Sequence, residues 1–160
     1  HLLSHKVKLL WRFHKVHHLD VGMDVTTALR FHPIEIILSL LYKSFFIIML
    51  GIRPNSIIIF EVILNTMAMF NHSNIFINKT FDKYLKYFIV TPSMHLIHHS
   101  VIPSEYNTNY SFNLSIWDRI FKTYLSRNQG EIKIGLNEYK GENISLVNLL
   151  LVPIKKARRY

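Results

Sequence analysis

The sequence predicts an all-α protein in which a membrane-embedded helical hairpin carries a histidine-rich helical cap on the cytosolic side. Three observations lead to this prediction. Two long apolar segments are joined by a short turn, and the motif H-x2-H-H occurs twice, beginning at His14 and again at His95. The chain of 160 residues also combines 49% hydrophobic residues with a formal net charge of +9. This length suits one main domain.

The composition narrows the classes of protein and of site. The chain contains no cysteine, which excludes disulfides, cysteine-type zinc sites and iron–sulfur clusters. A strongly basic chain first suggests nucleic-acid binding. The long Ile, Leu and Phe runs favour instead a membrane protein with basic cytosolic edges, and we expect no nucleic-acid partner.

The histidines form a repeated pattern typical of a metal site. His1 and His5 form H-x3-H, and two triplets follow the H-x2-H-H spacing. These triplets are His14, His17 and His18, and His95, His98 and His99. Residues three and four apart share a face of a helix, so each triplet is expected to direct its imidazoles at one point. On one unbroken helix, the first pair would face away from the first triplet. We therefore predict a break or bend within Lys6–Phe13.

The number of histidines predicts two metal ions rather than one. Imidazole binds Fe, Cu, Zn and Ni, so the ligand type alone does not select the metal. A catalytic zinc needs about three protein ligands, whereas nine or ten histidines supply two metals with four or five each. Neither H-E-x-x-H nor Glu-x-x-His, the motifs of zinc proteases and soluble di-iron bundles, occurs here.

The segment between the first triplet and the hairpin offers supporting residues. Leu19–Thr27 reads as a loop in which Asp20 and Asp24 are candidates to accept an imidazole N–H and fix its tautomer. The alternative for both is a turn or cap residue. His32 precedes Pro33 and is a candidate ligand, supporting group or lipid-headgroup contact.

The hairpin is predicted from two apolar helices, Ile34–Leu50 and Ile57–Phe70, with the turn Gly51–Ser56 between them. The first is nearly long enough to span a bilayer. Lys43 and Glu61 lie inside these helices and keep a buried, soluble hairpin as the alternative. His72 follows where the second helix would return to the side of His18, so it is a candidate ligand.

The remaining segments surround the predicted site. Phe76–Val90 is amphipathic and suits a membrane surface, and Ser93 is the expected N-cap of the second triplet's helix. The polar loop Ser100–Ser111 is expected to line or cover the site. Leu114–Tyr124 predicts a short helix. Residues 125–160, with an apolar run at Ile144–Val152 and the basic end KKARRY, show nothing catalytic.

Two metals held by imidazoles at the mouth of a membrane hairpin point to oxygen chemistry on a lipid. The protein would then hold one C–H bond of an apolar chain against the metals and exclude water. One alternative is a di-zinc or other metal-binding membrane hydrolase without oxygen chemistry. The other is a basic, helical nucleic-acid-binding protein.

The motifs HLLSH, FHKVHH, FNHSN and HLIHH, followed by NTNYSFNLSIWDRIFKTY, resemble the fatty acid hydroxylase/sterol desaturase superfamily, from His1 to about Tyr124. The stretch DVTTALR is similar to the alkylglycerol monooxygenase branch. The resemblance implies an integral membrane, non-haem di-iron enzyme that uses O2 and electrons to hydroxylate or desaturate a sterol, fatty acyl or alkylglycerol lipid. It also implies two iron ions and a separate electron donor of the cytochrome b5 or ferredoxin type.

By motif, the resemblance assigns as metal ligands His1, His5, His14, His17, His18, His72, His95, His98 and His99. His32, Asp20, Asp24 and Asn109 are candidates for a supporting or ligating role. Ser111 and Lys122 stand where the family usually has glycine, which bears on substrate detail rather than on metal binding. We expect a histidine-box domain at 1–124 that lacks upstream membrane helices, and a C-terminal tail at 125–160.

Overall fold

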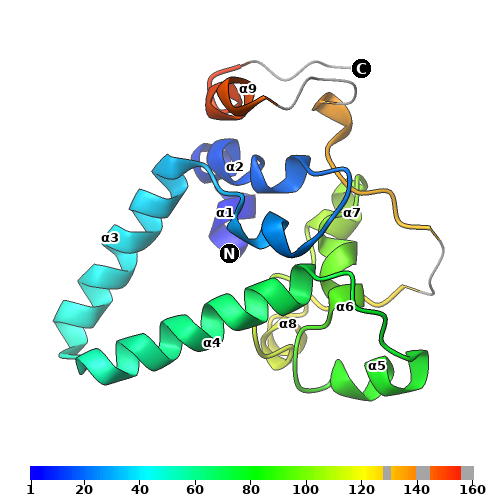
Figure 1. The fold of residues 1–160 in the computed structure, drawn as a ribbon, viewed down its shortest axis with the longest axis horizontal. Coiled ribbons are helices and arrows are strands. Elements are labelled where there is room, and N and C mark those ends of the chain that lie inside the picture. Colours follow the sequence, from blue (N-terminus) through cyan, green and yellow to red (C-terminus); the bar gives the residue numbers. More distant parts are fainter. Residues whose placement is uncertain (128–130, 140–144, 156–160) are drawn as a thin grey trace.

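In the computed structural model, residues 1–127, 131–139 and 145–155 are described, and they are helical with connecting loops (Figure 1). The α-helices are α1 (Leu2–Lys6), α2 (Lys8–His14), α3 (Pro33–Leu50), α4 (Pro54–His72), α5 (Lys79–Leu85), α6 (Pro92–His98), α7 (Pro103–Tyr106), α8 (Ile116–Ile120) and α9 (Leu146–Leu151). The 3-10 helices are η1 (His17–Leu19), η2 (Val25–Leu29) and η3 (Asn137–Tyr139). These ranges contain no β-strand, only two isolated bridges, so the all-α prediction is confirmed.

The predicted break in the first helical segment occurs at a single residue. Helix α1 ends at Lys6 and α2 begins at Lys8, and Val7 between them is extended, with φ −90° and ψ 113°. A β-branched residue tolerates this conformation well. The break reorients the chain so that the rings of His5 and His14 lie 4.8 Å apart between centroids. The predicted break within Lys6–Phe13 is confirmed.

Helix α3 has clear start and stop signals. Pro33 occupies the first turn, where its missing N–H is not needed. The side chain of His32 caps this end by accepting a hydrogen bond from the backbone N–H of Ile34 at 3.2 Å. At the other end, Gly51 adopts φ 62°, and the N–H of Ile52 bonds to the carbonyl of Ile47. This is the Schellman geometry that glycine favours.

Helix α4 is longer than predicted, because Pro54 begins it within the expected turn and His72 belongs to its last turn. Figure 1 shows α3 and α4 diverging from their connection, which is the tip of an open V. Lys43 on α3 and Glu61 on α4 form an ion pair across this V. By length and composition, α3 is the one described helix suited to crossing a membrane, and none of it is buried. Membrane embedding of the pair stays a prediction.

The N-cap of α6 differs from the prediction. Thr91 caps the helix through its side chain, and Pro92 occupies the first position. Because proline fits a helix only in its first turn, the cap must precede residue 92. The expected cap, Ser93, instead donates a hydrogen bond to Asp82 Oδ2 at 2.7 Å. The prediction for Ser93 was therefore wrong.

The C-terminal segments pack against α2 and η1. Val152 and Leu136 form a buried apolar cluster with Val16 and Leu19. Arg12 Nε also donates to the carbonyl of Pro153 at 2.7 Å. The predicted apolar run corresponds to α9. Residues 140–144 and 156–160, which include most of the basic end, lie outside the described residues.

The contact between α9 and η1 predicts a position-dependent loss of stability. Val152→Ala removes methyl groups from a side chain that is 4% exposed, so we expect a loss of roughly 1 to 3 kcal/mol. The same change at Val147, which is 65% exposed on α9 itself, should cost little. Chemical denaturation of the detergent-solubilised chain measures both variants. Equal losses would show that this contact does not stabilise the fold.

Candidate metal centre

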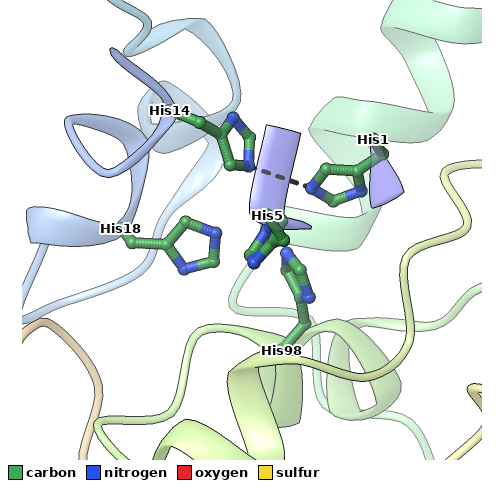
Figure 2. Close-up of side chains that lie close together, drawn as sticks. All are labelled: His1, His5, His14, His18 and His98. Atoms are coloured by element: carbon green, nitrogen blue, oxygen red, sulfur yellow. Dashed lines mark hydrogen bonds between the residues drawn. The ribbon is translucent and has the colours of Figure 1, made fainter. Parts of the chain in front are cut away.

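Nine histidines gather into two clusters. Cluster 1 consists of His1, His5, His14, His18 and His98, and cluster 2 consists of His17, His72, His95 and His99. Within each cluster, one nitrogen per ring lies within 4.8 Å of the corresponding nitrogens of the other rings. Figure 2 shows the rings of cluster 1 turned toward a common centre. All nine side chains are buried except that of His1, which is partly exposed.

The two clusters divide each triplet, contrary to the expectation that a triplet meets at one point. His14 and His18 belong to cluster 1 and His17 to cluster 2, whereas His95 and His99 belong to cluster 2 and His98 to cluster 1. In the second triplet the N–H of His99 bonds to the carbonyl of His95, as in a regular helix. Residues four apart are then about 40° apart around the axis and consecutive residues about 100° apart, so His95 and His99 stay together and His98 diverges. The first triplet runs from the end of α2 through a turn into η1, so its division follows from this change of direction of the chain.

This division places the clusters side by side. The consecutive residues His17 and His18 supply one ring to each cluster, and so do His98 and His99. The rings of His18 and His99 stack across the boundary with centroids 4.5 Å apart. The arrangement suits two neighbouring metal ions.

Five of the rings are held by an oxygen acceptor at Nδ1. In cluster 1, Nδ1 contacts Tyr110 O (His1, 2.6 Å), Glu35 Oε1 (His14, 2.6 Å) and Thr108 O (His98, 2.7 Å). In cluster 2, it contacts Arg30 O (His17, 3.3 Å) and Ala68 O (His72, 2.7 Å). A carbonyl or carboxylate oxygen accepts, so Nδ1 carries the proton in each ring. Nε2 then presents its lone pair to the cluster.

With this tautomer, two contacts between rings bring lone pairs to face each other, and such contacts require a cation. Nε2 of His1 lies 3.0 Å from Nε2 of His14, and Nε2 of His17 lies 3.1 Å from Nε2 of His72. Because Nδ1 holds the proton in all four rings, each contact brings two lone pairs together. Neutral rings in this geometry repel, whereas a metal ion between the lone pairs would bind both.

The electrostatics favour neutral rings. Burial lowers the pKa of His5 to about 3, and the positive charge of neighbours such as His17 adds to the effect. Burial is also the first cause that holds pKa values well below the usual range for His14, His17, His18, His95, His98 and His99. A protonated imidazole that donates a hydrogen bond to the facing nitrogen therefore does not explain these contacts.

Other ring nitrogens point to the same conclusion. Both nitrogens of His5 and of His18, and Nε2 of His98, are buried without a hydrogen-bond partner among the described residues. A buried polar atom without a partner is costly. Metal coordination would satisfy one nitrogen of each of these rings, which all belong to cluster 1. Together with the facing lone pairs in both clusters, the donor set fits a metal ion in each cluster.

Glu35 is a supporting residue that the sequence analysis did not identify. It lies in the first turn of α3, where its Oε1 accepts from His14, and its Oε2 is buried without a partner in the described part of the chain. A carboxylate bonded to Nδ1 raises the basicity of Nε2 and fixes the ring. The available signal was a single acid in the first turn of a largely apolar helix.

The loop 108–111 holds cluster 1 through its backbone, and Asn109 fixes this loop. Asn109 has φ 51° and is fully buried. Its Nδ2 donates to the carbonyls of Met94 and Leu125 at 3.1 and 2.9 Å, and its Oδ1 accepts from the N–H of Leu125 at 2.9 Å. The carbonyls on either side of it, at Thr108 and Tyr110, are the acceptors for His98 and His1. Asn109 thus positions two rings without contacting them.

Asp118 on α8 completes this support, and the sequence analysis also missed it. Its carboxylate accepts from the N–H groups of Tyr110 and Ser111, at 2.8 and 3.0 Å, and from Thr123 Oγ1 at 2.6 Å. It is 1% exposed. Three donors to one buried carboxylate fix the loop strongly. The only sequence signal for this role was the position of Asp118 in WDRIF, shortly after the polar loop.

The structure does not bring three of the predicted supporting residues to the clusters. Asp20 accepts from Thr27 and Arg30, and Asp24 caps η2. His32 caps α3 and contacts the carbonyl of Leu150 at 3.3 Å through Nε2. Among the described residues, each has a structural partner other than a cluster imidazole.

Aromatic rings cover the edges of both clusters. Phe31 stacks on His17 with centroids 4.3 Å apart, and Phe112 stacks on His1 at 4.5 Å. The Tyr110 ring lies 5.1 Å from that of His5. These rings keep water from the imidazoles and lower the local dielectric, which strengthens metal–ligand attraction.

Comparison with known proteins identifies the family of the chain. The family model for fatty acid hydroxylase matches residues 1–123. The chain is 30% identical over 124 residues to the ornithine lipid hydroxylase OlsE of Rhizobium tropici, covering 78% of this chain and 37% of that protein. It is 31% identical over 125 residues to the alkylglycerol monooxygenase of Xenopus tropicalis, covering 78% and 27%. No solved structure matches the chain.

The chain thus spans about a third of the length of these curated relatives. The human alkylglycerol monooxygenase gives a similar result, with 29% identity over 129 residues. The region matched by the family model contains all nine clustered histidines, and the inferred resemblance to the superfamily and to its alkylglycerol monooxygenase branch is confirmed. The chain belongs to the fatty acid hydroxylase family.

Proposed function

We propose that this protein is an O2-dependent, di-iron oxidoreductase that hydroxylates or desaturates a C–H bond of a lipid. The observation that carries the proposal is the pairing of Nε2 lone pairs within each cluster, which calls for a cation at two adjacent points. Two iron ions would supply the activation of O2, which side chains alone do not provide. Relatives named as an ornithine lipid hydroxylase and an alkylglycerol monooxygenase support a lipid substrate.

The chain's own residues would contribute binding, orientation and exclusion of water. All nine histidines are the proposed ligands, His1, His5, His14, His18 and His98 for one ion and His17, His72, His95 and His99 for the other. The acceptors at Nδ1 orient the rings, and the aromatic cover limits access of water. The apolar α3 and α4 are the proposed membrane anchor, with the clusters on the cytosolic side and a separate carrier delivering electrons.

The first prediction concerns metal content. His17→Ala and His99→Ala each remove a ligand from cluster 2, so iron bound per chain should fall from about two toward one. Lipid turnover by the full-length protein should be abolished. Because His32 lies outside both clusters, His32→Ala is the control and should retain both ions. Iron analysis of the purified variants, with lipid profiling of cells that express them, provides the measurements.

Two results would contradict the proposal. Retained turnover in both His17→Ala and His99→Ala would remove the clusters from the reaction. Zinc in place of iron, with lipid cleavage that does not consume O2, would favour the metal-dependent hydrolase instead.

A second prediction concerns Glu35. Glu35→Gln keeps the shape of the side chain but replaces the charged acceptor of the His14 Nδ1–H, so iron affinity in cluster 1 should fall by about 10-fold to 100-fold. Glu61→Gln is the matched control because Glu61 pairs with Lys43 on the hairpin. Competition with a chelator measures both affinities. Equal iron retention in the two variants would show that Glu35 does not support His14.

A third prediction concerns Asp118. Asp118→Asn removes the charge that holds the loop 108–111, so the ion in cluster 1 should be lost to chelator at least about tenfold faster. The ion in cluster 2 should be retained. Asp24→Asn is the control, because asparagine also caps a helix well and Asp24 contacts neither cluster. Loss of both ions at the same rate in Asp118→Asn would indicate general unfolding and contradict a specific positioning role.

A further inference from the structure

An aromatic surface extends over α5 and α8, outside both groups of histidines. Six side chains contribute to it, and the least exposed of them, Tyr87, is still 52% exposed. A contiguous group of large apolar rings in water marks an interaction site. We call this surface the aromatic face, and it consists of Phe81, Tyr84, Tyr87, Phe88, Trp117 and Phe121.

Hydrogen bonds join the two parts of the aromatic face into one unit. The N–H of Ser115 donates to the carbonyl of Phe88 at 3.2 Å, and its Oγ donates to the carbonyl of Lys86 at 2.6 Å. Arg119 donates to the same carbonyl of Lys86 at 3.1 Å, and its guanidinium lies 4.8 Å from the centre of the Tyr87 ring. The two helices are therefore held in a fixed relative position, as an interaction surface requires.

The accessible charge beside the aromatic face is positive. Both acids of α5 and α8, Asp82 and Asp118, are buried. Asp82 pairs with Lys86 Nζ at 2.6 Å, and the carboxylate of Asp118 holds the loop 108–111. No carboxylate of these two helices therefore competes for a bound anion. The face is complementary in charge to an anionic partner through three exposed lysines, which are Lys79, Lys83 and Lys122.

The aromatic face begins where the proposed membrane anchor ends. Helix α4 ends at His72, and Phe76, four residues later, is 86% exposed. Asn71 Nδ2 donates to the carbonyl of Phe112 at 2.5 Å, so the segment that leads into α8 is attached to the same helix end. Figure 1 shows α5 and α8 close to this end of α4. A bilayer that holds α3 and α4 would therefore have its surface near this face.

The combination of rings and lysines identifies the anionic partner as a lipid surface. Tryptophan and tyrosine are favoured at the level of the lipid headgroups, where an amphipathic ring contacts both apolar and polar groups. Lysines near a bilayer are attracted to anionic headgroups. An acidic protein would satisfy the lysines, but an adjoining bilayer also accommodates the six rings.

We propose that the aromatic face binds the anionic headgroup region of a bilayer, with Lys79, Lys83 and Lys122 contacting phosphate or carboxylate groups and the rings lying among the headgroups. The position of the bilayer rests on the membrane anchor named in the proposed function. The selectivity is additional, because an apolar hairpin inserts without regard to headgroup charge, whereas this face favours anionic lipids.

The test uses Trp117 as a reporter within the face. The chain contains two tryptophans, so Trp11→Phe leaves Trp117 as the only one, and iron content confirms that this background retains the fold. The iron-loaded protein is placed in phosphatidylcholine nanodiscs that contain a minor fraction of brominated phosphatidylserine or brominated phosphatidylcholine. Bromine quenches tryptophan fluorescence on contact, so quenching measures the local concentration of each lipid. The serine lipid should be enriched about fivefold or more, and high salt should abolish this enrichment.

Charge variants connect the enrichment to the face. Lys79→Gln combined with Lys83→Gln removes two of the three lysines, and each lysine near an anionic surface changes affinity by about fivefold. This double variant should therefore lose the enrichment and keep its quenching by phosphatidylcholine. Lys8→Gln combined with Lys133→Gln is the matched control, because both lysines are exposed outside the face, and it should retain the enrichment.

Three results would overturn the proposal. The first is equal quenching by both lipids at low salt, and the second is an unchanged enrichment in the double variant of Lys79 and Lys83. The third is absence of quenching by either lipid, which would show that the face lies away from the bilayer and is covered by another partner.

Flotation with vesicles separates this proposal from the proposed function. If the hairpin does not insert, the face alone should still bind the chain to vesicles that contain phosphatidylserine and not to vesicles of phosphatidylcholine. If that binding is also absent, both the anchor and the face are wrong. If the protein binds no iron and the enrichment persists, the oxygenase is wrong and the lipid contact remains supported.

Discussion

The fold depends on burying imidazoles that must remain neutral while their lone pairs face one another. Among the described residues, ten buried side chains are hydrophobic and twenty are polar or charged. This composition is unusual, because a protein interior normally gains stability from apolar burial. Nine of the rings meet in two adjacent groups. Bound cations would offset the mutual repulsion of the lone pairs and the lost hydration of the rings, and they would thereby couple metal binding to folding.

The surrounding backbone enforces this arrangement. Four of the five acceptors at Nδ1 are backbone carbonyls, and the fifth is Glu35. A backbone acceptor does not depend on the side chain at its position, so the path of the backbone itself determines the tautomer. The buried side chains of Asn109 and Asp118 then fix the loop that contributes two of these carbonyls. The clustered rings are thus positioned by supporting residues that are far apart in the sequence.

Much of this site could be predicted from the spacing of histidines, because helical periodicity is a local property. The break near Val7 followed from the incompatible directions of His5 and His14 on a single helix, and the ends of α3 followed from Pro33 and Gly51. The division of each triplet between two clusters was not predicted, because side chains that differ in direction by about 100° around a helix were expected to reach one point.

The supporting residues were harder to predict, since their partners are distant in the chain. Glu35 meets His14 only because α3 begins beside α2, and Asp118 meets Tyr110 only through a turn of the loop. Asp20 and Asp24 were predicted as candidate acceptors for an imidazole N–H because they are close to a triplet in the sequence. They instead complete local caps and pairs, which is the commoner use of aspartate in loops. Proximity along the chain was the misleading signal.

The long sequence separation within each cluster has a consequence for biosynthesis. Cluster 1 joins His18 to His98, and cluster 2 joins His17 to His99, so a ribosome must complete most of this region before either group of ligands is whole. A nascent chain that carries only the first triplet has an incomplete site, and closing so long a loop carries an entropic cost. Insertion of the proposed metal ions would therefore follow the synthesis of the hairpin.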